Sequence, residues 1–191
     1  MDSFFNEKEL SLLNIKFGKN VKISRKSSIY GNDIEIGDNV RIDDFCILSG
    51  KIRLGDYIHI AAYSALYGGS EGIYIYNYAN VSSRVSIYAV SDDYSGEAMT
   101  NPMVPDKYKN VDNRKVIIKQ HVIIGATSVV LPGVVLGEGS AFGSFSFIDK
   151  DSEEWSINTG IPAKKIKDRS RECLKYELEM KKNKEVFQNG K

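Results

Sequence analysis

The chain has 191 residues, and its 26 Lys plus Arg nearly balance its 25 Asp plus Glu. This length suits one domain with its own core, and the balance argues against a nucleic-acid binder, which usually carries a basic excess. The chain start has no signal-peptide pattern, and no apolar run approaches the ~20 residues of a membrane span, so we expect a cytoplasmic protein.

The first segment, residues 3–13, has the pattern of a short amphipathic helix. Ser3 or Asn6 is suited to cap its first turn, because either side chain can accept a hydrogen bond from the backbone N–H groups there. We predict that residues 1–14 form a helical cap on the segment that follows.

The middle of the chain repeats every six residues, which fits neither a helix nor a long alternating strand. It fits a chain that turns a corner every six residues, so that three sides make a triangular coil. Stacked coils then bring the repeating side chains together inside as ladders. These residues are Phe17, Ile23, Ile29, Ile36, Ile42, Leu48, Leu54, Ile60, Leu66, Ile75, Val81, Ile87, Ile118, Ile124, Val130, Leu136, Phe142 and Ile148.

Two further features accompany the ladders. A second, often small residue recurs four positions after them, such as Cys46 or Ser128, and Gly often follows directly, such as Gly37 and Gly125. Gly suits a corner where φ is positive or where the backbone is crowded. An ordinary β-sandwich with accidental spacing is the alternative, and the number of phased positions disfavours it.

Blocks such as IGDNVR, IGATSV and LGEGSA resemble the hexapeptide-repeat acyltransferases, and the resemblance covers residues 15–168. It implies an all-β, left-handed parallel β-helix over residues 15–153, an exception to the usual right-handed crossover. It also implies a homotrimer that binds acyl-CoA between neighbouring subunits. The carbonic anhydrases with this fold bind zinc through three His, whereas this chain has two, so we expect no metal.

The repeat is interrupted twice. Three extra residues between Leu66 and Ile75 predict a small bulging loop with several glycines. A longer interruption at 91–115 has two prolines, mixed charge and no period, and such a loop in a compact repeat is usually functional or mobile. The resemblance implies that this loop is extruded and covers the substrate site.

Asp92, with Asp93 beside it, is the first candidate for chemistry. The resembled O-acetyltransferases have a catalytic His at the mouth of the loop, and here Asp92 takes that place. A sugar hydroxyl needs a base such as His, and a carboxylate with an ordinary pKa of about 4 is a weak base. A neutral amine attacks a thioester without losing a proton first, so it mainly needs positioning, which Asp can supply.

The stretch SDDYSG therefore favours N-acylation, and it resembles enzymes that N-acylate dTDP-linked amino sugars for surface glycans of the lipopolysaccharide type. The alternative is that Asp92 and Asp93 form only a solvated turn. Of the two histidines, His59 is interpreted as packing or capping. His121 follows the loop, so it could face the cleft of a neighbouring subunit and take part in catalysis.

The acyl-CoA site rests on the resemblance of GIPAKKIKDR, residues 160–169, to the closing motif of the family. The resemblance implies that an aliphatic residue and Pro pack on adenine, that basic residues lie near the phosphates, and that small residues line the pantetheine arm. Lys150 is a second phosphate partner, and the alternative for the lysines is a solvated tail. The implied contacts are Ile161, Pro162, Lys164, Lys167, Ala126 and Ser144.

The sugar site is expected before the loop. Ser82 follows a ladder residue and should point outward to bind the substrate, with Ser83, Arg84 and Tyr94 nearby. Arg84, with Lys107 and Lys109, could meet the diphosphate of a dTDP- or UDP-linked sugar. The alternative is that these residues are plain surface.

The last segment, 154–191, is expected to hold the tail and a C-terminal helix over about residues 168–187 that frays toward Lys191. Cys46 and Cys173 show no metal-ligand spacing, so both are expected to be reduced thiols. Together the residues and the resemblance predict an acetyl-CoA-dependent N-acetyltransferase of nucleotide-linked amino sugars. The alternatives are a sugar O-acetyltransferase with His121 as base and a non-catalytic β-helix scaffold.

Overall fold

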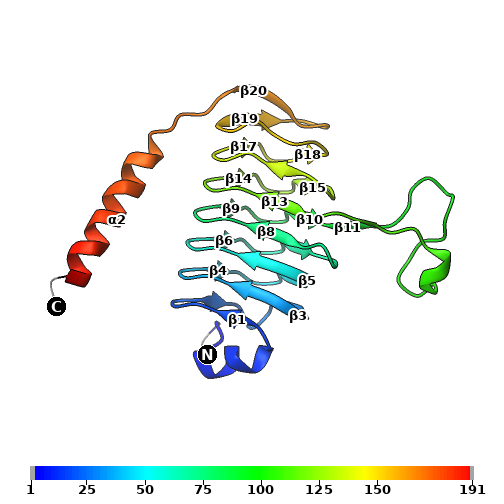
Figure 1. The fold of residues 1–191 in the computed structure, drawn as a ribbon, viewed down its shortest axis with the longest axis horizontal. Helices are drawn as coiled ribbons and strands as arrows, with labels where there is room; N and C mark the ends of the chain where they lie inside the picture. The colour runs from blue at the N-terminus through cyan, green and yellow to red at the C-terminus, as the bar shows by residue number, and fades with distance from the viewer. Residues whose placement is uncertain (1–2, 190–191) are drawn as a thin grey trace.

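The computed structural model describes residues 3–189, so the outermost residues of the predicted terminal segments, and the predicted fraying toward Lys191, lie outside the described residues. The main body is a parallel β-solenoid, in which the chain winds through stacked coils from β1 near the N-terminus to β20 at the far end (Figure 1). This architecture confirms the prediction of an all-β helix built from six-residue sides.

One sheet forms a single face of the solenoid, with its strands parallel up to β19. The last strand, β20 (Lys164–Asp168), pairs antiparallel with β19 and ends the stack. The parallel strands of this face are β2 (Lys22–Ile23), β4 (Arg41–Ile42), β6 (His59–Ile60), β9 (Asn80–Val81), β14 (Ile123–Ile124), β17 (Ala141–Phe142) and β19 (Ser156–Thr159).

A second sheet folds around a corner and forms the other two faces, because β3 (Ser28–Ile36) and β5 (Ile47–Leu54) run along both. On one face they join β1 (Lys16–Phe17), β8 (Ile73–Ile75), β13 (Val116–Ile118) and β16 (Val135–Leu136). On the other face they join β7 (Ala65–Tyr67), β10 (Ser86–Tyr88), β15 (Val129–Val130) and β18 (Phe147–Ile148).

The predicted ladders form the core. Ile60, Val81 and Ile124 are direct partners on successive coils, and all three side chains are fully buried. The second series is buried with them, including Cys46 and Ser128. Burial of each large aliphatic side chain stabilises the fold by about 1.5–3 kcal/mol, so the ladders supply most of the apolar burial that holds the coils together.

The glycines that follow ladder residues relieve crowding. A Cβ atom at Gly37 would lie 2.6 Å from the carbonyl oxygen of Gly55, and one at Gly125 would lie 2.5 Å from the backbone nitrogen of Ser144. Positive φ occurs instead two positions beyond these glycines, for example at Asn39 (φ 58°). Of the two reasons considered for these glycines, close approach of the next coil is therefore the correct one.

The N-terminal cap is shorter than expected. Helix α1 (Glu7–Leu10) passes directly into a 3₁₀ turn, η1 (Ser11–Leu13). Asn6 caps the helix, since its side chain accepts from the backbone N–H of Glu9 while the Glu9 carboxylate accepts from the backbone N–H of Asn6. The cap is therefore Asn6 and not Ser3, and Leu10 packs into the core of the first coil.

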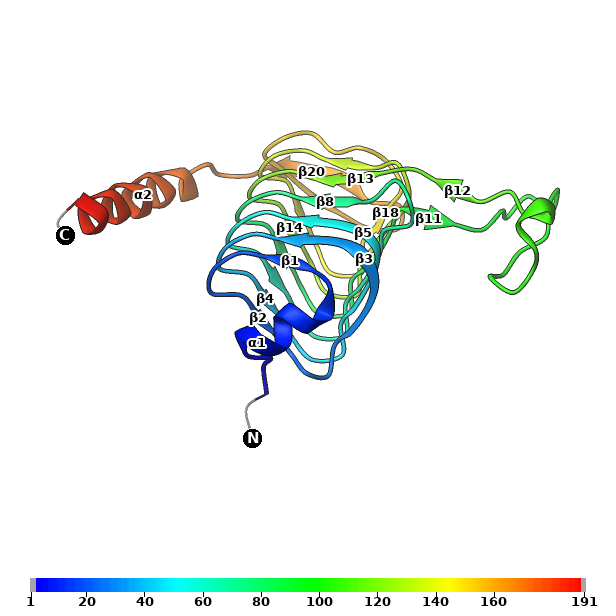
Figure 2. The ribbon, with the colours of Figure 1, turned by 60° about the horizontal axis from the view of Figure 1, so that its bottom comes forward.

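Two segments leave the solenoid on opposite sides (Figures 1 and 2). The loop at 91–115, called here the extruded loop, starts at β11 (Val90–Ser91), contains the turn η2 (Asp106–Tyr108) and returns at β12 (Asp112–Asn113), which pairs antiparallel with β11. On the other side, α2 (Cys173–Asn189) runs back along the stack. None of the helices within residues 3–189 is long and apolar enough to cross a membrane.

Candidate active site

A cavity of about 720 Å³ lies where the extruded loop leaves the solenoid. The loop contributes residues at both of its ends, and β10, β15 and β18 contribute the floor. A volume of this size falls within the range of small-molecule sites. Its lining includes Tyr88, Asp92, Asp93, Tyr94, Arg114 and Asp149.

The two neighbouring aspartates have different surroundings. Asp93 accepts hydrogen bonds from the backbone N–H and hydroxyl of Ser95 and from the backbone N–H of Ala98, at 2.9, 2.9 and 3.0 Å. These bonds, with those from Ser95 first, lower the pKa of Asp93. Asp92 accepts one longer bond, 3.2 Å, from the backbone N–H of Asn101. Asp93 alone thus caps the turn that was considered as the alternative for both aspartates, whereas Asp92 is the less constrained carboxylate at the cavity.

The returning end of the loop adds charged groups that the sequence analysis missed. Arg114 and Asp112 form a two-point ion pair at 2.7 and 2.6 Å, and the hydrogen bond from Arg114 lowers the pKa of Asp112. Both residues line the cavity. The sequence did hold one signal for these residues. A loop inserted in a continuous solenoid must return close to where it left, so the last residues of the loop lie beside Asp92.

The predicted sugar contacts lie on another corner. Ser82, Ser83 and Arg84 follow β9, and the whole of β10 separates them from Asp92. They do not belong to the described lining of the 720 Å³ cavity. Arg84 is exposed, and its guanidinium lies 5.1 Å from the ring centre of Tyr63. A single solenoid therefore does not bring Ser82 and Asp92 together.

The other cations expected near the diphosphate are engaged within the extruded loop. Lys109 forms an ion pair with Asp106 at 2.8 Å, and the ammonium of Lys107 lies 4.7 Å from the ring centre of Tyr108. Tyr94, by contrast, lines the cavity and is 93% exposed. Of the loop residues named from the sequence as sugar or nucleotide contacts, Tyr94 is thus the one at the cavity.

His121 lies on the side of the solenoid that faces α2. Its ring is sandwiched between Tyr78 and Trp155, with centroids 5.1 and 6.0 Å away. Its Nε2 atom lies 2.8 Å from a carboxylate oxygen of Glu177 in α2, and its side chain is 9% exposed. The expectation for His121 concerned the cleft of a neighbouring subunit, which a single chain does not test; within the chain, the C-terminal helix covers His121.

Glu177 provides a pH-dependent contact for α2. Burial alone would raise its pKa, but hydrogen bonds from Lys181 and His121 outweigh burial and hold the pKa below its ordinary value of 4.5. A carboxylate with a lowered pKa stabilises the folded state above its unfolded pKa, and this contribution is lost as pH falls through the folded pKa.

We expect Glu177→Gln to speed hydrogen exchange of α2 amides about tenfold at pH 7, because a charge-assisted hydrogen bond is worth about 1.5 kcal/mol or more. The difference should shrink below pH 4.5. The matched variant Glu172→Gln removes an exposed ion pair with Lys175 and should have little effect. Equal exchange rates for Glu177→Gln and the unmodified protein at pH 7 would contradict this role.

The residues expected to bind acyl-CoA fall into two groups. Ala126 and Ser144 occupy the same corner as Ser82, on successive coils, where Ala126 accepts a hydrogen bond from the backbone N–H of Phe145. Ile161, Pro162, Lys164 and Lys167 are exposed on the tail and β20. Lys150 stands apart, exposed after β18 next to the cavity residue Asp149.

Residues 115–150 match a sequence profile described as bacterial transferase hexapeptide, six repeats. A dTDP-4-amino-4,6-dideoxy-D-glucose acyltransferase of Escherichia coli is 49% identical over 92% of this chain and 93% of its own length. A putative lipopolysaccharide biosynthesis O-acetyl transferase of the same species is 28% identical over 87% of this chain and 88% of its own.

Solved structures are similar to this chain as well. The N-acyltransferase AntD of Bacillus cereus, in complex with dTDP and 3-hydroxybutyryl-CoA, superimposes with a TM-score of 0.94, is 51% identical, and covers 97% of this chain and 100% of its own. A second structure of that enzyme holds dTDP-4-amino-4,6-dideoxyglucose and coenzyme A, with a TM-score of 0.93.

The solenoid, the loop cavity and these similarities define the class of protein as a left-handed β-helix transferase. The chain belongs to the hexapeptide-repeat acyltransferases, and acyl-CoA is its co-substrate. Both the predicted handedness and the predicted family are thereby confirmed. No three His, Cys, Asp or Glu side chains in residues 3–189 are grouped closely enough to hold a metal ion.

Proposed function

We propose that this enzyme transfers an acyl group from acyl-CoA to the amino group of a dTDP-linked amino sugar. Its main support is similarity along almost the whole chain to an enzyme crystallised with a dTDP-linked amino sugar and coenzyme A. The acyl group is acetyl or larger, since the same relative was crystallised with 3-hydroxybutyryl-CoA. The product is an N-acylated sugar for a surface glycan such as lipopolysaccharide, made in the cytoplasm.

Asp92 is proposed to orient the amine and, once the nitrogen has attacked, to accept one of its protons. The neutral amine attacks the thioester carbon, the C–S bond breaks, and the thiolate of coenzyme A takes up a proton. A carboxylate that hydrogen-bonds the amine holds it in line for attack. Backbone N–H groups along the coil edges steady the oxyanion. Asp93, which caps the turn, is proposed to position Asp92.

A pair of residues in the Bacillus cereus enzyme supports the roles of Ser82 and Asp92. That enzyme has been crystallised with a single serine replaced and with a single aspartate replaced. The two replaced residues are separated along its chain by the same number of positions as Ser82 and Asp92 are here. Ser82 is proposed to hydrogen-bond the substrate or the thioester oxygen.

Three copies of the chain are proposed to form a closed trimer. Ser82, Ala126 and Ser144 lie on one corner of the solenoid and Asp92 lies on another, so two copies are needed to bring both corners to one substrate. Within the described residues, those up to Asn14 are proposed to cap each copy, the β-helix from residue 15 to β19 is proposed to carry the catalytic site, and the rest is proposed to supply the tail and helix. Light scattering should give a mass three times 21.4 kDa.

His121 is proposed to anchor α2, which leaves sugar O-acetylation without an available histidine base at the loop.

The function is tested by thiol release from acetyl-CoA and 3-hydroxybutyryl-CoA, measured against a panel of dTDP- and UDP-linked amino sugars. We expect release with a dTDP-linked amino sugar. Release of no thiol with any amino sugar would refute the proposed activity and favour a non-catalytic scaffold.

The tail lysines give a separate expectation for acyl-CoA. We expect the double variant Lys164→Gln, Lys167→Gln to raise KM for acetyl-CoA about tenfold, because each lost phosphate contact removes roughly 0.7 kcal/mol. KM for acetyl-pantetheine, which lacks the nucleotide phosphates, should not change. Lys16→Gln, at the other end of the solenoid, is the control. An equal rise in KM for both donors would contradict a phosphate role.

A further inference from the structure

The face that carries β2, β4, β6 and β9 presents one outward side chain per coil, in a straight column, because its strands pair in register. Neighbouring coils are about 4.8 Å apart. The side chains are polar or charged up to β9 and apolar beyond it, and Ser82 comes directly after β9. From the N-terminal coil, the column reads Lys22, Arg41, His59, Asn80, Ile123, Ala141 and Ile157.

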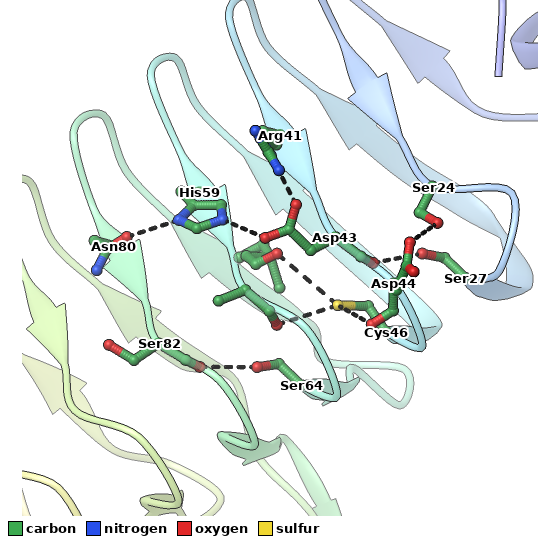
Figure 3. Close-up of polar contacts among 12 residues, drawn as sticks. Ser24, Ser27, Arg41, Asp43, Asp44, Cys46, His59, Ser64, Asn80 and Ser82 are labelled. Atoms are coloured by element: carbon green, nitrogen blue, oxygen red, sulfur yellow. Dashed lines mark hydrogen bonds and ion pairs between the residues drawn. The ribbon is translucent and has the colours of Figure 1, made fainter. Parts of the chain in front are cut away.

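The polar side chains of the column form a network of hydrogen bonds and ion pairs (Figure 3). Asp43 accepts a hydrogen bond from Arg41 Nε at 2.7 Å, and its other oxygen lies 2.7 Å from His59 Nε2. His59 Nδ1 lies 3.2 Å from Asn80 Oδ1. Both ring nitrogens of His59 therefore lie within hydrogen-bond distance of an oxygen atom, so the network fixes the ring in place.

Asp43 holds the side chains of Arg41 and His59 without covering them. Burial alone would raise its pKa, but the hydrogen bonds from His59 and then Arg41 outweigh burial and keep the pKa low, so the carboxylate stays charged. The Asp43 side chain is 20% exposed, whereas those of Arg41 and His59 are 57% and 41% exposed. Both side chains are thus fixed in place and partly open to solvent, which lowers the ordering cost of binding a ligand.

The chemistry of the open groups suits an anion. Asp43 accepts from the Nε atom of Arg41, so this ion pair does not use the two terminal nitrogens of the guanidinium. Arginine binds a phosphate through two nitrogens that donate side by side. Beside the network lies a groove of about 370 Å³, large enough for part of a nucleotide. It is lined by Asn39, Arg41, Tyr57, Ile58 and His59.

We infer that Arg41, positioned by Asp43 beside His59, binds the diphosphate of the nucleotide-linked sugar, an inference that rests on the proposed function. Arg41 lies two coils, about 10 Å, below the coil of Asn80 and Ser82, a span that one hexose and the long Arg41 side chain cover together. The nucleotide then extends toward the N-terminal coils. Acyl-CoA approaches along the apolar upper column, from the end of the solenoid that carries the tail.

The test uses dTDP as the probe, with affinity measured by calorimetry on the full-length protein. Arg41→Met is expected to weaken dTDP binding about tenfold or more, because it removes a charge-assisted contact. Arg41→Lys should restore only part of the affinity, since Lys keeps the charge and loses the fork. In turnover, KM for the dTDP-linked amino sugar should rise while KM for acyl-CoA stays the same.

Arg53→Met is the matched control, because Arg53 is an ion-paired arginine on a neighbouring face, and dTDP affinity should stay within twofold. Unchanged dTDP affinity in Arg41→Met would overturn the inference. A loss of affinity that follows dissociation of the oligomer would also overturn it, since this face would then be a subunit contact. In either case the proposed function still stands if the unmodified enzyme acylates the sugar, and only the proposed diphosphate site is rejected.

Discussion

Replacement of Asp92 by Asn is expected to lower kcat for acyl transfer to a dTDP-linked amino sugar by about 10²-fold or more, because a positioned proton acceptor contributes roughly 10²–10⁴-fold. KM for acyl-CoA should change little, since the tail and the small-residue corner bind it elsewhere. Asn keeps the size of the side chain and can still accept from the backbone N–H of Asn101, so the loop should hold its shape. Steady-state thiol release measures both constants.

Asp93→Asn is the matched control, since it removes one negative charge from the adjacent residue. The Asn side chain still accepts from the backbone N–H of Ser95, a bond that Asp93 makes at 2.9 Å, so kcat should fall less than tenfold. The same loss of activity in both variants would mean that loop shape, and not the carboxylate of Asp92, limits turnover. Full activity of Asp92→Asn would remove Asp92 from the reaction.

Replacement of Ile87 by Ala is expected to lower the free energy of unfolding by about 2–5 kcal/mol, the usual cost of truncating a fully buried aliphatic side chain. Ile87 is 0% exposed and stacks between Leu66 and Val130 on neighbouring coils. A cavity there breaks the ladder in the middle of the solenoid, where both neighbouring coils lose contacts. Urea titration measures the change.

Ser86→Ala provides the comparison on the same strand, because Ser86 points outward and is only partly buried. Its effect should stay within about 0.5 kcal/mol. A loss of less than 1 kcal/mol for Ile87→Ala would show that the ladders contribute less to stability than their burial indicates.

The architecture was predictable because its physical cause repeats along the chain. An apolar residue every sixth position is visible without coordinates, and nearly all of these residues, such as Leu48 and Ile124, are buried as the period requires, while Phe17 and Ile29 in the first coils are only partly buried. The interruption at 91–115 was visible for the converse reason, since it lacks the period. The glycines were only partly predictable, because crowding at Gly125 depends on how closely Ser144 on the next coil approaches.

The candidate site was less predictable, since it depends on contacts between distant segments. The sequence indicated Asp92 through its place at the mouth of the loop. It gave no sign that Asp93 would cap the turn alone, or that Glu177, 56 positions further along the chain, would reach His121. His59 was interpreted as packing, and its two polar partners, Asp43 and Asn80, become its neighbours only when the coils stack.

The bond formed in the product tests the central claim most directly. The product of a reaction with acetyl-CoA and a dTDP-linked amino sugar can be treated with neutral hydroxylamine and analysed by mass spectrometry. N-acylation predicts an amide that survives the treatment, with one thiol released for each acyl group transferred. An acyl group that hydroxylamine removes would be an ester, and that result would contradict transfer to the amine.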